Sequence, residues 1–166
     1  MPKRYVVFKW VIYAAATFLL LQVQTWALDY VELWGVTPFL APMLVGVVSS
    51  YEGSLAGPLF ALVFGVLCDL GTVSPASAFF TFIFTAAALA AALMAEHLFS
   101  PGFLCSLAST TVCYVITALG RLALLGSGAW EAGAFLALRE FLVTLPLLLV
   151  VFPVYRWVHN KTTIEY

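Results

Sequence analysis

The chain has 166 residues, of which 64% are hydrophobic and only 9% are charged, and its formal net charge is -1. Because a soluble domain carries about 25% charged residues, the composition excludes an ordinary soluble domain and predicts a multi-pass membrane protein. The chain also lacks the basic excess that nucleic-acid-binding proteins use, so we expect no nucleic-acid partner.

Six apolar stretches have the length that a helix needs to cross a bilayer, about 20 residues. They cover residues 10–27, 34–50, 54–70, 76–95, 102–125 and 133–155. Each should be an α-helix, because lipid cannot satisfy the hydrogen bonds of an open backbone. The connections are too short to hold a soluble domain. The sequence therefore predicts an all-α membrane bundle of six transmembrane helices, with residues 1–166 forming one integral-membrane domain and neighbouring helices antiparallel.

Basic residues precede the first stretch and follow the last one. They are Lys3, Arg4, Lys9, Arg156 and Lys161. The positive-inside rule then places both termini in the cytoplasm, which requires an even number of crossings. An alternative is that the basic start, the first apolar run and Thr25-Trp26-Ala27 form a cleaved signal peptide. Its removal would leave five crossings and upset the balance of charge.

Small residues recur at every fourth position from the start of the third stretch. They are Gly53, Gly57, Ala61 and Gly65. In lipid, such a strip lets two helix backbones approach closely. The second stretch has a similar strip, formed by Pro42, Gly46 and Ser50. We therefore expect the second and third helices to pack face to face through these strips, with Gly53 in the tight turn between them.

Glu52 lies beside that turn, at the predicted cytoplasmic end of the bundle. One interpretation is a solvated turn residue, which the dipole of the following helix favours. The other is a contact for a cytoplasmic partner protein. The sequence alone leaves both interpretations open.

Four charged residues fall in the outer half of the predicted bundle. They are Asp69, Arg121, Arg139 and Glu140. A charge at the bilayer centre costs roughly 2.5–3.5 kcal/mol, and these four formal charges cancel, so we expect a buried polar cluster. Arg139 and Glu140 differ by about 100° around their helix and cannot share a partner. One arrangement pairs Arg139 with Asp69 and Glu140 with Arg121. The cluster either fixes helix packing or binds a ligand or partner.

The sequence offers no recognisable catalytic or metal-binding motif. Cys68, Cys105 and Cys113 lack the spacing of a metal or redox motif, and His97 and His159 are far apart in the chain. Protease, hydrolase and phosphate-loop signatures are missing too. We therefore expect no cofactor, no metal and no enzymatic activity.

Two segments resemble the rod shape-determining protein MreD family. The first is PFLAPMLVGVVSSYEGSLAGPLFALVFGVLCDLGTVSPASAFF, which has the family's Glu52-Gly53 turn and its step from Gly65 to Asp69. The second is REFLVTLPLLLVVFPVYRWV, which is similar in Thr144, Pro146 and Pro153 and in the basic end that follows. The likeness covers the whole chain in architecture, and its specific part is residues 38–75.

The resemblance implies a non-enzymatic protein of the bacterial inner membrane that belongs to the cell-elongation complex. Such a protein binds MreC, acts beside MreB, RodA and a class B penicillin-binding transpeptidase, and supports lateral peptidoglycan synthesis and the regulation of cell shape. The family is also similar in fold to the substrate-binding S components of energy-coupling-factor transporters. An S component for a vitamin or metal ion is therefore the alternative function.

Overall fold

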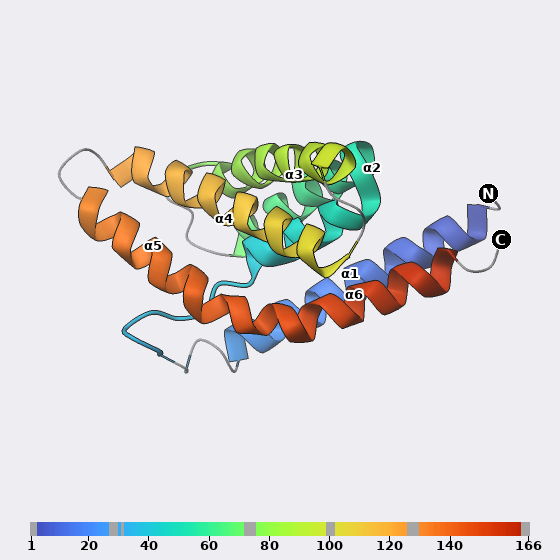
Figure 1. The fold of residues 1–166 in the computed structure, drawn as a ribbon, viewed down its shortest axis with the longest axis horizontal. Helices are drawn as coiled ribbons and strands as arrows, with labels where there is room; N and C mark the ends of the chain where they lie inside the picture. The colour runs from blue at the N-terminus through green and yellow to red at the C-terminus, as the bar shows by residue number, and fades with distance from the viewer. Residues whose placement is uncertain are drawn as a thin grey trace.

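The computed structural model describes residues 3–26, 30, 32–71, 76–98, 102–125 and 130–163. These residues form an all-helical structure (Figure 1). The helices are α1 (Lys3–Trp26), α2 (Ala41–Gly71), α3 (Phe79–Leu98), α4 (Phe103–Leu125), α5 (Trp130–Thr144) and α6 (Leu148–Thr163), and the 3-10 helix η3 (Leu145–Leu147) joins the last two.

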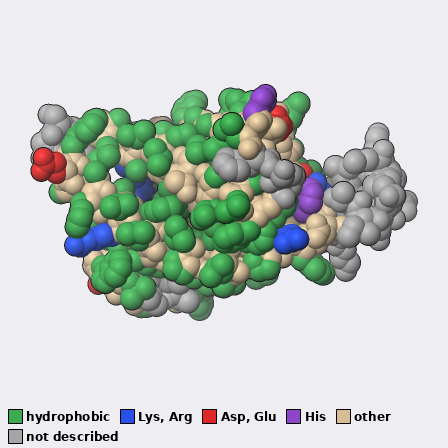
Figure 2. Space-filling view, viewed as in Figure 1, with side chains coloured by type: hydrophobic (Ala, Val, Ile, Leu, Met, Phe, Trp, Pro, Cys, Tyr) green, Lys and Arg blue, Asp and Glu red, His purple; other side chains and the backbone are tan. Residues whose placement is uncertain are grey.

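Five helical segments in the described part of the chain are long and apolar enough to cross a membrane. They are Val7–Trp26, Ala41–Gly71, Phe79–Leu98, Phe103–Leu124 and Trp130–Asn160. Figure 2 shows apolar side chains over the middle of the visible face and charged ones toward its two ends. An apolar belt between charged ends is what a bilayer requires. The structure therefore indicates a multi-pass membrane protein, as the composition predicts.

The helix α2 folds back on itself at Gly53. This glycine has φ 75° and ψ -173°, a backbone conformation that residues with a side chain rarely adopt. Beyond it, Gly57 lies so close to Ser49 that a Cβ atom on Gly57 would be 3.0 Å from the Ser49 Cα. In a straight helix these residues would be about 12 Å apart. We call residues 41–52 the first arm and residues 54–71 the second arm of α2.

The first arm begins later than the sequence predicts. The predicted helix over residues 34–50 is wrong in its first part, because residues 34–40 are not helical and the helix begins at Ala41. Pro38 explains the difference, since a proline disfavours helical geometry at the residue before it. Pro42 is tolerated because it is the second residue of the helix, where its missing N–H is not needed.

The first arm forms the centre of the molecule. Every residue from Ala41 to Ser50 is buried. The second arm, α3 and α4 pack around the first arm, and α1 and α6 run side by side along one flank (Figure 1). The N-terminal end of α1 and the C-terminal end of α6 lie together, and we call this the terminal end of the bundle.

The strip of small residues on the second arm packs against two different neighbours. Near the turn, Gly57 faces the first arm, as predicted, and Ala61 is fully buried. Farther along, Gly65 faces α3, where a Cβ atom would lie 2.6 Å from the Thr81 Cα. A four-residue step rotates a position by about 40° around a helix. The strip therefore turns away from the first arm, and the prediction is wrong for Gly65.

The strip on the first arm packs against α4 and not against the second arm. A Cβ atom on Gly46 would lie 2.6 Å from the Thr110 Cα. One turn later, the hydroxyls of Ser50 and Ser106 are 2.9 Å apart. The expected face-to-face packing of the two strips is therefore wrong. Ser49, which lies outside that strip, provides the surface for Gly57.

Candidate functional site

The Glu52 carboxylate joins three helices at the terminal end of the bundle. It lies 2.6 Å from the Lys9 ammonium and accepts a hydrogen bond of 2.9 Å from the Tyr13 hydroxyl, both on α1. The Nδ1 atom of His159, on α6, is 3.5 Å away. Only 6% of the Glu52 side chain is exposed, against 21% for Lys9. We call Lys9, Tyr13, Glu52 and His159 the Glu52 cluster.

A ladder of aromatic and hydroxyl groups extends this cluster along the interface between α1 and α6. The rings of Tyr13 and Tyr155 stack with centroids 5.5 Å apart. The Tyr155 hydroxyl shares a buried hydrogen bond of 2.7 Å with the Thr17 hydroxyl. These polar groups satisfy one another inside an apolar bundle, where an unpaired group would be costly. The cluster therefore fastens both terminal helices to the turn of α2.

The carboxylate of Glu52 does not match the interpretation of a solvated turn residue. Its side chain points into the chain and binds groups on two other helices. A contact between this turn and a partner protein stays a prediction.

The backbone just after the turn is hydrogen-bonded to α3, since the N–H of Ser54 donates a hydrogen bond of 2.7 Å to Glu96 Oε1. Glu96 thus caps the second arm from the end of α3.

At the opposite end, Asp69 caps the start of α3. Its carboxylate accepts hydrogen bonds from the backbone N–H groups of Phe80 (3.0 Å) and Thr81 (2.9 Å) and from the Thr81 hydroxyl (2.7 Å). The first N–H groups of a helix have no partner within the helix, and a negative charge there is favourable. Asp69 is therefore a packing residue that links the second arm to α3.

The predicted polar cluster separates into two sites. Arg121 on α4 and Glu140 on α5 form the expected pair, at 2.9 Å. Arg139 instead donates a hydrogen bond of 3.3 Å to the Trp34 carbonyl, and its guanidinium lies 4.5 Å from the centre of the Phe135 ring. The predicted pair of Arg139 and Asp69 is wrong. Consecutive residues differ by about 100° around a helix, so Arg139 lies on the exposed side of α5 when Glu140 faces Arg121. Asp69 is instead hydrogen-bonded to the start of α3.

The non-helical segment before the first arm has its backbone satisfied by distant side chains. We call residues 37–40 the Phe39 segment. The N–H of Phe39 donates to the Thr144 hydroxyl at 3.1 Å, and the N–H of Leu40 donates to Gln24 Oε1 at 3.0 Å. The Tyr114 hydroxyl donates to the Phe39 carbonyl. Non-helical backbone at membrane depth is tolerated only where protein satisfies it in this way.

Arg121 takes part in the same arrangement. Its guanidinium lies 4.5 Å from the centre of the Phe39 ring while it pairs with Glu140. Thr144 also donates a hydrogen bond of 2.7 Å to the Glu140 carbonyl. The pair that the sequence predicted therefore supports the Phe39 segment. The roles of Gln24, Tyr114 and Thr144 were not predicted, although a break at Pro38 signals that such partners are needed.

The pair of Arg121 and Glu140 offers little room for a ligand, whereas a hollow of about 440 Å³ with a mostly apolar lining lies beside Arg139. The cavity beside Arg121 and Glu140 has a volume of about 10 Å³, which is enough for roughly one water molecule. Cys105 and Cys113 are buried thiols that form no disulfide bond. Among the residues that the structure describes, no three His, Cys, Asp or Glu side chains converge on a point that could hold a metal ion. The arrangement at both ends is suited to holding helices in place.

Comparisons of the chain with known protein families, curated proteins and solved structures give no match.

Proposed function

We propose that the chain is a non-enzymatic scaffold of the MreD type in the bacterial inner membrane. The observation that carries the proposal is the role of the residues behind the resemblance. Glu52 and Gly53 form the turn at which three helices meet, and Gly65 and Asp69 fasten the second arm to α3. Residues that hold a bundle in one shape are what a scaffold needs to present fixed surfaces to its partners.

The partners in this proposal follow from the resemblance. MreC is the direct partner, and MreB, RodA and a class B penicillin-binding transpeptidase belong to the same assembly, which builds lateral peptidoglycan. Exposed apolar side chains on α5, such as Phe135, Leu138 and Leu142, leave surface for a membrane-spanning partner. The proposal includes no cofactor and no nucleic acid.

We further infer six crossings with both termini in the cytoplasm. The first arm is about 18 Å long, and the Phe39 segment adds about 13 Å of extended chain. Together they match the roughly 30 Å of a bilayer core. The second arm then returns across the membrane, so Ala41–Gly71 contributes two crossings. The exposed Arg156 and the partly exposed Lys9 at the terminal end favour the cytoplasmic side.

Affinity purification of the tagged chain in mild detergent, followed by mass spectrometry, tests the proposal. We expect a single-span protein with a periplasmic coiled coil, together with wall synthases. Phe135→Ala should lower recovery of the membrane-spanning partner, and Leu104→Ala, at an exposed position on α4, is the control that should recover the same proteins. Recovery of none of these partners would contradict the scaffold.

The alternative is an S component of an energy-coupling-factor transporter, which would bind a vitamin or metal ion. Its ligand would need a polar cavity, and the cavity of about 10 Å³ beside Arg121 and Glu140 speaks against a vitamin there. The same purification separates the two functions. Recovery of paired ATPases and a larger transmembrane coupling protein would favour the S component.

A further inference from the structure

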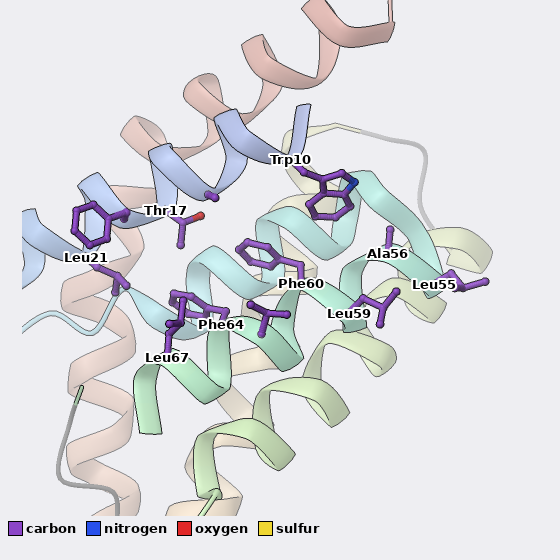
Figure 3. Close-up of a pocket in the computed structure, with 12 residues that line it drawn as sticks. Trp10, Thr17, Leu21, Leu55, Ala56, Leu59, Phe60, Phe64 and Leu67 are labelled. Atoms are coloured by element: carbon purple, nitrogen blue, oxygen red, sulfur yellow. The ribbon is translucent and has the colours of Figure 1, made fainter. Parts of the chain in front are cut away.

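A deep apolar groove runs between α1 and the second arm of α2. Its volume is about 540 Å³. Figure 3 shows side chains from both helices along it, among them Trp10, Thr17 and Leu21 from α1 and Leu59, Phe60 and Phe64 from the second arm. This groove is separate from the charged sites at the two ends of the bundle.

The fold holds this groove open by attaching α1 at both ends to other parts of the chain. At the terminal end, Lys9 and Tyr13 bind Glu52 at the turn of α2. At the opposite end, Gln24 accepts a hydrogen bond from the N–H of Leu40 in the Phe39 segment. Between these attachments α1 packs on α6, through Thr17 and Tyr155. The face of α1 toward the second arm is thus left uncovered along its middle.

The chemistry of the lining selects a hydrocarbon occupant. Its polar side-chain groups are the Trp10 indole at one end and the Thr17 hydroxyl. That hydroxyl already shares a hydrogen bond with Tyr155 at 2.7 Å. A polar ligand in the middle of the groove would lose its hydrogen bonds to water and gain none, which is costly. A hydrocarbon chain loses nothing there.

The length of the groove favours a lipid chain over a helix of another protein. From Trp10 to Leu21 the groove follows α1 for about 16 Å. That is about half of the roughly 30 Å of a bilayer core, which is the depth that the acyl chains of one leaflet occupy. A helix that spans the membrane would extend well beyond the groove, whereas acyl chains match its length.

One end of the groove is suited to a lipid headgroup. Trp10 lies at the terminal end, and tryptophan is typical of the interface between lipid and water. Its neighbour Lys9 keeps 21% of its side chain exposed. An ammonium group has three N–H donors, so the ion pair with Glu52 leaves donors for a second anion. The donors of Lys9 that Glu52 leaves unused are suited to an anionic headgroup.

We propose that this groove binds the acyl chains of an anionic phospholipid, with the headgroup at Lys9 and the chains along α1. The lipid replaces a helix–helix contact that the fold leaves unmade, and it fills the space between the terminal helices and the second arm. This site does not depend on the scaffold proposal, since it would exist whichever proteins the chain binds.

Two adjacent alanines on α1 provide a matched test. Ala14 lines the groove, whereas Ala15 is exposed and does not line it. The purified chain, stripped of lipid in detergent, is titrated with dioleoyl phosphatidylglycerol and dioleoyl phosphatidylcholine, and native mass spectrometry counts the bound lipid. We expect one tightly bound phosphatidylglycerol, with about a fivefold preference over phosphatidylcholine from one basic residue. Ala14→Phe should weaken binding at least tenfold, and Ala15→Phe should leave it unchanged.

A second variant covers the case in which Ala14→Phe does not fold. Ala56→Leu narrows the groove from the other wall and should weaken binding in the same direction. Three results would overturn the proposal: no phospholipid bound above the level of Ala14→Phe, equal loss in Ala14→Phe and Ala15→Phe, or a co-purified single-span protein that only the groove variants release. The last result would assign the groove to a partner helix.

Discussion

The Glu52 carboxylate is held by charged and polar groups on two other helices. It is almost fully buried, and its partners lie on two helices at opposite ends of the chain. Removing one member of a buried pair costs more than the pair itself contributes, because it leaves the other charge uncompensated. Lys9 is partly exposed and can reach water, so the loss here is moderate.

We expect Glu52→Gln to lower the free energy of unfolding by about 1–3 kcal/mol, the usual cost of losing a charged hydrogen-bond partner. The replacement keeps the size of the side chain but leaves the Lys9 ammonium without its counter-charge. Steric trapping or thermal unfolding in detergent measures the change. Glu131→Gln is the matched control, because Glu131 is exposed at the start of α5. Equal stability of the two variants would show that the cluster does not fasten the helices.

Thr144 has a comparable role at the other end of the bundle. Its hydroxyl accepts from the Phe39 N–H and donates to the Glu140 carbonyl. Thr144→Val keeps the shape but leaves a half-buried backbone N–H without a partner, so we expect a loss of about 1–3 kcal/mol. Thr111→Val removes only a hydrogen bond to the carbonyl of Leu107 on the same helix and should cost little. A Thr144→Val variant as stable as Thr111→Val would refute the role of Thr144 in holding the Phe39 segment.

Close approach of helix backbones decides how α2 packs on its neighbours. The second arm meets α3 at Gly65, where backbone atoms of Phe80 and Thr81 leave no space for a side chain. Backbone cannot move aside as the end of a flexible side chain can. Each methyl group added at such a contact therefore forces the helices apart.

We expect Gly65→Ala to lower the free energy of unfolding of the bundle by about 1–3 kcal/mol, because the added methyl group overpacks the contact between α2 and α3. Gly71→Ala is the control, because a Cβ atom at Gly71 would have no atom within 4 Å and this glycine ends the same helix. Thermal unfolding of the two variants in detergent compares them directly. A Gly65→Ala variant that melts with or above Gly71→Ala would mean that α2 and α3 are not in close contact there.

Most helices could be predicted from the sequence, but the start of the first arm could not. Apolar composition places residues 34–40 in the membrane without saying whether they are helical. Their backbone partners, such as Gln24 and Thr144, lie far away in the chain, so only the fold brings them together. The pair of Arg121 and Glu140 was predictable because depth in the membrane and helix geometry limit the choices. The contact of Arg139 was not predictable, because its partner is the backbone carbonyl of Trp34 and every residue has such a carbonyl.

At the scale of the whole molecule, a core of α2, α3 and α4 is flanked by the paired helices α1 and α6. The pair is attached through the Glu52 cluster at one end and through Gln24 at the other. The groove between these attachments has a volume of about 540 Å³. Changes at either attachment should therefore alter the groove, and with it the proposed lipid site.

A double crossing of the membrane by α2 is the central inference, because it places both termini on one side. Cysteine labelling with a membrane-impermeant maleimide tests this in a variant whose three native cysteines are replaced by alanine. Single cysteines are placed at the exposed positions Leu55, Leu70 and Asn160. We predict that Leu70→Cys is labelled in intact spheroplasts, and that Leu55→Cys and Asn160→Cys are labelled only after the membrane is opened. Labelling of Leu55→Cys and Leu70→Cys from the same side would contradict the double crossing.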